Sequence, residues 1–77
     1  MRHPSVHRQS LREELLAMTE RLVAEYAGRV PAGSVMRYVA RCHEQLRLAG
    51  VEDELVVAIE RAVRQRLADV APAHAVA

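Results

Sequence analysis

The sequence contains a single cysteine, Cys42, which is followed directly by His43 and, five residues later, by Arg47. A thiol beside a potential base and a cation could act as a thiolate nucleophile on an oxyanion. Loops that do this use a Cys-x5-Arg spacing and direct their backbone N–H groups at the anion. Here the spacing is Cys-x4-Arg, and Leu48 occupies the position that the arginine would need. The spacing therefore argues against a catalytic loop.

The segment around Cys42 also has the periodicity of a helix that packs against neighbours, with apolar residues spaced four, three, four and three apart. These residues are Val35, Val39, Cys42, Leu46 and Ala49. In the middle of a helix the backbone N–H groups are already hydrogen-bonded and cannot bind an anion. We therefore predict that Cys42 is a buried structural residue and that His43 and Arg47 lie on the wetter edge of the helix. The alternative for His43 is a role as a ligand or base.

Other residues that could support chemistry lack the partners they would need. His3 and His7 could share a helical face, and a free N-terminal amine with histidine at position three can bind copper or nickel. Both histidines lack a nearby acidic or thiolate third ligand. There is no Gly-rich phosphate loop and no pair of carboxylates spaced in a supported pocket. We expect no metal, no cofactor and no enzymatic activity.

The composition is that of one small globular domain: 77 residues, of which 51% are apolar and 27% charged. The core must be aliphatic, because there is no Phe or Trp, and the single cysteine excludes an internal disulfide. Association is therefore the leading way to stabilise so small a domain. The formal net charge is only +1, so no global field draws the chain to nucleic acid or to anionic lipid. The longest apolar run, Leu55 to Ile59, is too short to span a membrane, so we expect a cytoplasmic protein.

Three helices are expected, over about residues 10–28, 32–49 and 52–71. Ser10 and Glu13 fit a capping box at the start of the first, and Gly28 fits its end. Pro31 suits the first turn of the second helix, and three carboxylates at positions 52 to 54 suit the start of the third. Residues 1–9 and 72–77 are predicted to be disordered tails.

The short connections make the helices turn back on each other, which predicts an all-α fold, an antiparallel three-helix bundle over residues 10–71. The apolar arcs of the first and third helices are wider than a three-helix core requires, so a second copy of the chain is the expected partner. We place the homodimer interface on exposed parts of these arcs. The predicted interface residues are Leu16, Val23, Val56, Val63, Arg66 and Leu67. Arg66 either lays its stem over apolar surface or forms a salt bridge between subunits.

A small DNA-binding or regulatory protein is the alternative function, because a three-helix unit can hold a helix-turn-helix. The arginines that would contact phosphates are Arg37, Arg41, Arg61 and Arg64. Acidic residues alternate with these arginines, including Glu60 at the i,i+4 position from Arg64, so solvated helix faces are the simpler explanation.

The stretches LVAEYAGRVPAGSVMRYVARCHEQL and AIERAVRQRLADV resemble a bacterial three-helix-bundle dimerisation domain. That domain is found N-terminal to arsenate-reductase-like and low-molecular-weight tyrosine-phosphatase-like catalytic domains. The resemblance covers about residues 11 to 70 and implies a non-catalytic module that pairs chains through helix faces. It also implies a second candidate partner, a separate arsenate-reductase-like or phosphatase-like protein.

Overall fold

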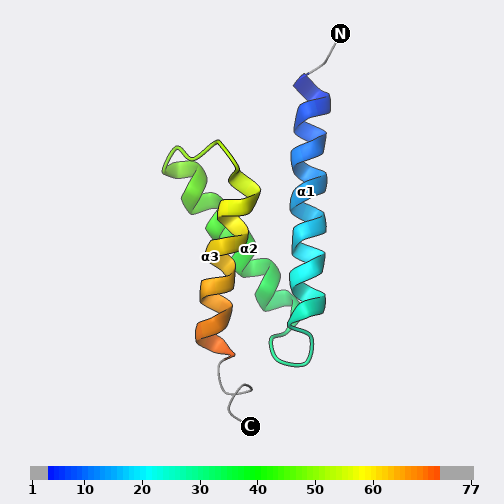
Figure 1. Cartoon of the computed structure of the whole chain (residues 1–77), viewed down its shortest axis with the longest axis vertical. Coiled ribbons are helices and arrows are strands. Elements are labelled where there is room, and N and C mark those ends of the chain that lie inside the picture. Colours follow the sequence, from blue (N-terminus) through cyan, green and yellow to red (C-terminus); the bar gives the residue numbers. More distant parts are fainter. Residues whose placement is uncertain (1–3, 72–77) are drawn as a thin grey trace.

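The computed structural model describes the backbone of residues 4–71 and the side chains of residues 10–71. The chain forms three helices in these residues: α1 (Pro4–Glu25), α2 (Ala32–Leu48) and α3 (Leu55–Val70). Successive helices run in opposite directions, with α2 inclined to the other two (Figure 1). The predicted all-α three-helix fold is confirmed. The predicted tails at residues 1–3 and 72–77 lie outside the described residues.

Helix α1 begins at Pro4, six residues before the expected start at Ser10. Proline is well suited to a first helical position, because its missing N–H group would have no partner there. The five residues that follow contain no glycine or proline, so nothing interrupts the helix before Ser10. The predicted capping box is therefore wrong, as is the predicted tail over residues 4–9.

At its other end α1 stops at Glu25, earlier than expected, and Gly28 adopts the left-handed conformation with φ of 87°. The N–H groups of Arg29 and Val30 both donate to the Tyr26 carbonyl, each at 2.9 Å. This turn directs Val30 inward, where it is only 6% exposed. Val30 is a core residue that helical periodicity does not detect, because it lies in a connection.

Helix α2 follows the sequence expectation closely, with Pro31 preceding it in an extended conformation. It ends in a Schellman motif, in which the N–H of Val51 donates to the Leu46 carbonyl and the N–H of Gly50 donates to the Arg47 carbonyl, both at 3.0 Å. Gly50 has a φ of 85° in this motif. The predicted end of the second helix at residue 49 is therefore correct to within one residue.

Helix α3 begins at Leu55 rather than near Glu52, so the three carboxylates precede its first turn. Glu54 caps the helix with a left-handed φ of 51°, and its carbonyl accepts a hydrogen bond from the N–H of Ala58 at 3.0 Å. A residue with positive φ cannot continue a right-handed helix, which is why Glu52 and Asp53 lie in the turn.

The core lies where the three helices meet, and α2 and α3 share the largest contact. The fully or nearly buried residues are Met18, Leu22, Val30, Val35, Val39, Cys42, Ile59, Val63 and Leu67. Val70, the last residue of α3, is 51% exposed and lies outside this core. The N-terminal part of α1 extends beyond α2 and α3 (Figure 1). Leu11, a described apolar residue in this part of the helix, is only partly buried.

Replacing Gly50 by alanine is expected to lower the free energy of unfolding by about 1 kcal/mol, because an L residue is strained at positive φ. A Cβ at Gly50 would meet no atom within 4 Å, so the loss reports backbone conformation alone. Gly33→Ala is the matched control, since Gly33 lies in the first turn of α2 with equally free space. It should leave stability unchanged or raise it. Urea unfolding followed by circular dichroism measures both, and equal effects would contradict this explanation.

Candidate functional site

Cys42 lies in the middle of α2 with only 2% of its surface exposed, so the predicted structural role fits its environment. The nearby arginine, Arg47, is exposed and its guanidinium lies 3.6 Å from Glu44, a neighbour on the same helix. His43, the next residue along the chain, is half-buried. No solvent-facing nucleophile is assembled from these residues.

A metal site does not arise among the residues that the structure describes, where no three potential ligands gather. His3 lies outside the described residues, and for His7 only the backbone is described.

An apolar groove of about 320 Å³ runs between α1 and the start of α2. Leu16 and Met36 are 59% and 55% exposed there, and Val23 lies between them in the groove lining. The Thr19 hydroxyl donates to the Leu15 carbonyl at 2.8 Å, so it leaves no free polar donor in the groove wall. Glu20 is the charged residue in the lining. This surface has the properties of a protein contact site, being apolar, continuous and exposed.

The predicted interface residues divide among three places. Leu16 and Val23 share the α1–α2 groove, whereas Val56, a residue of α3, lines a separate cleft between α3 and α1. Val63 and Leu67 are 0% exposed, so their predicted place on an exposed surface is wrong. Both point into the core because α2 and α1 cover that face of α3.

Arg66 is half-buried on α3 and makes no ion pair within residues 10–71. Met36, which sequence reasoning missed, completes the groove. It follows Val35 directly, so it lies beside the buried stripe of α2, and only the position of α1 makes it part of a shared surface.

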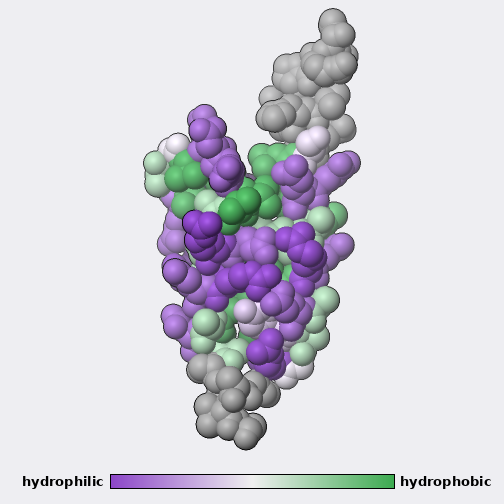
Figure 2. Space-filling view, in the orientation of Figure 1, coloured by the Kyte–Doolittle hydropathy of each residue, from purple (hydrophilic) through white to green (hydrophobic). Residues whose placement is uncertain are grey.

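A network of ion pairs joins α1 to α3. The Arg64 guanidinium donates two hydrogen bonds to the Glu25 carboxylate, at 2.8 and 2.9 Å, and others to Glu60 on its own helix. Arg21 donates to the second oxygen of Glu60 at 2.9 Å. Figure 2 shows hydrophilic side chains gathered in a belt across the middle of this face. The network orients α1 on α3, although each partly exposed pair stabilises only weakly.

The arginines of the DNA-binding alternative therefore differ in their environments. Arg37, Arg41 and Arg61 are exposed, while Arg64 is bound to two carboxylates. Arg29, which is four residues from Glu25, donates to its carbonyl oxygen at 3.3 Å and lies 4.8 Å over the Tyr26 ring.

The hydrogen bonds from Arg64 hold the pKa of Glu25 below its ordinary value of 4.5, and the charges of Arg64, Arg29 and Arg21 act in the same direction. Burial opposes these effects but does not outweigh them. The same hydrogen bonds, which Arg64 donates to Glu25, raise the pKa of Arg64 in return. The ionised form of Glu25 therefore stabilises the folded state.

The free energy of unfolding is expected to decrease as the pH falls below 4.5, the ordinary pKa of Glu25. The reason is that Glu25 takes up a proton at a higher pH in the unfolded chain than in the folded chain. The contribution of Glu25 is complete above that pKa and disappears as the pH falls through its lower value in the folded state. Urea unfolding across this range should show a shallower decrease for Glu25→Gln. Glu13→Gln removes an exposed carboxylate of the same helix and should keep the original slope. A slope unaffected by Glu25→Gln would contradict the assignment.

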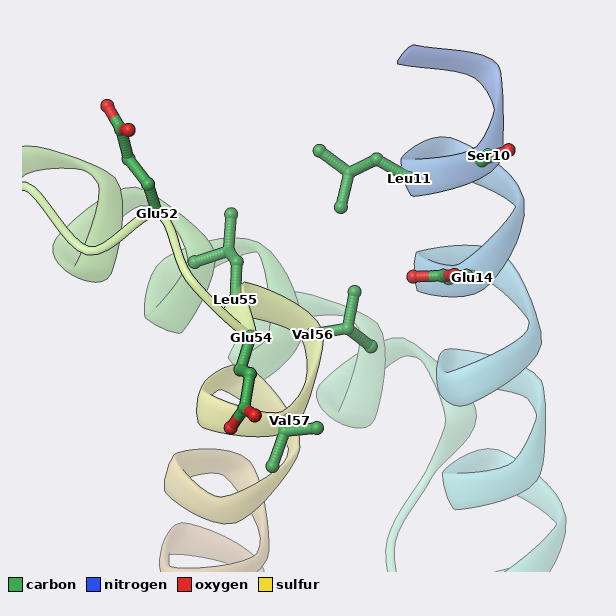
Figure 3. A pocket seen from close by; sticks show the side chains of 8 residues that line it. All are labelled: Ser10, Leu11, Glu14, Glu52, Glu54, Leu55, Val56 and Val57. Atoms are coloured by element: carbon green, nitrogen blue, oxygen red, sulfur yellow. The ribbon is translucent and has the colours of Figure 1, made fainter. Parts of the chain in front are cut away.

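A second cleft, of about 280 Å³, opens between the N-terminal part of α1 and the start of α3. Leu11 extends from α1 toward α3, and Val56 extends back toward α1 (Figure 3). The complete lining is Ser10, Leu11, Glu14, Glu52, Glu54, Leu55, Val56 and Val57. It combines an apolar floor with three carboxylates.

The described residues form an all-α fold in which an apolar groove lies on one side of α1 and a cleft with both apolar and acidic residues lies on the other. Comparisons with protein-family models, with curated proteins and with solved structures found no match. Among the described helices, none has the length and hydropathy needed to cross a membrane.

Proposed function

We propose that this chain is a non-catalytic dimerisation module that pairs with a second copy of itself through the α1–α2 groove. The observation that carries the proposal is the exposure of Leu16 and Met36, which leave more than half of two large apolar side chains in water on one continuous surface. A domain of 77 residues has only a small hydrophobic core, and small domains are often stabilised by association. Association would also cover the exposed apolar surface of the groove.

The spacing within the groove suits a symmetric pair of helices. Leu16 and Val23 are seven residues apart on α1 and therefore lie on nearly the same face. A two-fold axis between them sets Leu16 of each copy against Val23 of the other in antiparallel α1 helices. Because both side chains are already partly covered in the monomer, the gain is modest. We expect a dissociation constant of about 1 μM, so that the dimer predominates at tens of micromolar.

The resemblance to a bacterial dimerisation domain points to the same function, and a separate arsenate-reductase-like or phosphatase-like chain is the second partner in this proposal. A buried free cysteine suits a reducing compartment, so we place the protein in the cytoplasm. The DNA-binding alternative gains no support, because Arg64 already has two acidic partners and Arg37 and Arg41 lie on a different helix from Arg61.

Light scattering on a sizing column at tens of micromolar tests the proposal. The wild-type protein should elute with about twice the 8.6 kDa mass of the chain. Leu16→Glu should return it to the monomer mass, because a dimer would bury the new carboxylate. Leu48→Glu is the matched control, since Leu48 is 72% exposed and lies outside the groove. Circular dichroism verifies that each variant folds. A monomeric wild type, or dissociation by the control alone, would contradict the proposal.

A further inference from the structure

The cleft between α1 and α3 is an apolar surface that the fold leaves uncovered. Leu11, Leu55 and Val56 are each only partly buried, and Val57 is 51% exposed. Figure 2 shows hydrophobic residues gathered above the hydrophilic belt, between the upper parts of α1 and α3. The N-terminal part of α1 extends past the start of α3 (Figure 1), so none of the described helices lies beside that part of α1.

The carboxylates around this cleft lack the partners that other acids on the same face have. Glu25 and Glu60 are bound by arginines, whereas Glu14, Glu52 and Glu54 make no ion pair within residues 10–71. Among residues 10–71, no arginine lines the cleft. The rim is therefore a concentration of negative charge on a chain whose formal net charge is +1.

The apolar floor and the acidic rim of the cleft together indicate which class of partner could bind there. An open cleft of about 280 Å³ is too small and too shallow to enclose a typical ligand, since small-molecule sites span about 300–1,000 Å³ and bury most of the ligand. A helix laid across it needs only to insert a few apolar side chains. The carboxylates repel nucleic acid and anionic lipid and attract a basic segment.

We propose that the α1–α3 cleft is a docking site for a basic amphipathic helix of a partner protein. Apolar side chains on one face of that helix contact Leu11 and Val56, and flanking lysines or arginines pair with Glu14, Glu52 and Glu54. The α1–α2 groove shares no residue with this cleft, so docking here does not depend on the dimer.

A fluorescein-labelled 16-residue peptide is the probe, with leucines at i, i+3, i+4 and i+7 spacing and lysines at the remaining exposed positions. A second peptide carries glutamate in place of every lysine. Fluorescence anisotropy should detect binding of the lysine peptide, weaker binding as salt rises, and little binding of the glutamate peptide.

Two protein variants with the same net charge distinguish pairing at the cleft from attraction by the overall charge of the chain. Glu14→Gln/Glu52→Gln/Glu54→Gln should weaken binding by about tenfold or more, which corresponds to loss of local pairing. Glu13→Gln/Asp53→Asn/Asp69→Asn removes three exposed carboxylates that do not line the cleft and should keep binding within about twofold.

Three outcomes would overturn the docking site: no binding of the lysine peptide, equal binding of the glutamate peptide, or equal weakening by both triple variants. The Leu16→Glu variant distinguishes this proposal from the dimer, because it should bind the lysine peptide normally whether or not the wild-type chain self-associates. Leu11→Ser should weaken binding while the protein stays folded by circular dichroism, since Leu11 is outside the buried core.

Discussion

Replacing Leu22 by alanine is expected to lower the free energy of unfolding by about 3 kcal/mol. Leu22 is 0% exposed near the end of α1, where it belongs to the single core formed with α2 and α3. Truncation removes apolar contacts and leaves a cavity that the surrounding helices fill only in part. A domain of this length has a total stability of only about 4–11 kcal/mol. The substitution is therefore expected to remove between about a quarter and three quarters of the total stability.

Leu48→Ala is the matched control for this prediction. The chemical change is identical, but Leu48 is 72% exposed, so the free energy of unfolding should change by less than about 0.5 kcal/mol. Urea unfolding at one fixed protein concentration measures both variants, because self-association would make stability depend on concentration. Similar losses at the two positions would mean that α1 does not pack as described.

Cys42 is expected to react with a thiol-specific reagent about a thousandfold more slowly in the native protein than in denaturant. Its side chain is only 2% exposed in the core, so the reagent reaches the sulfur only when the fold opens. Leu48→Cys, made with Cys42 retained, provides an internal comparison. It should add one fast-reacting thiol at the exposed end of α2 while the slow one persists. Rapid labelling of native Cys42 would restore the nucleophile hypothesis.

The same environment predicts the ranking of two substitutions at this position. Cys42→Ala removes a small apolar group and should cost about 1 kcal/mol. Cys42→Ser should cost more, because it places a hydroxyl in an apolar core. The reverse order, measured by urea unfolding, would indicate a polar partner for the thiol.

Local patterns were sufficient for the existence of the helices and for much of the core. The four-three spacing around Cys42 correctly identified Val35, Val39 and Cys42 as the buried face of α2. Gly28, predicted to fit the end of the first helix, adopts a left-handed conformation shortly after α1 ends. These features depend on residues a few positions apart, so the sequence displays them directly.

Helix ends were predicted less well, because competing local signals are close in energy. Ser10 and Glu13 form a plausible capping box, yet Pro4 begins α1, and the left-handed Glu54 delays α3 beyond the acidic run. Val70 continues the apolar periodicity of α3 but extends past the end of the core.

The amino-acid sequence by itself determined that this is an all-α protein with three helices, a buried cysteine and more apolar surface than its own core uses. Only the tertiary structure decided which of these apolar residues are buried and which remain exposed. Helical spacing cannot distinguish Val63 and Leu67, which the other helices bury, from Leu16, which they do not. Likewise, Arg64 binds Glu25, 39 residues away, and Met36 joins Leu16 across a groove. The physical reason is that exposure and pairing depend on the position of a second helix, which is set by packing of the whole core and not by any local period.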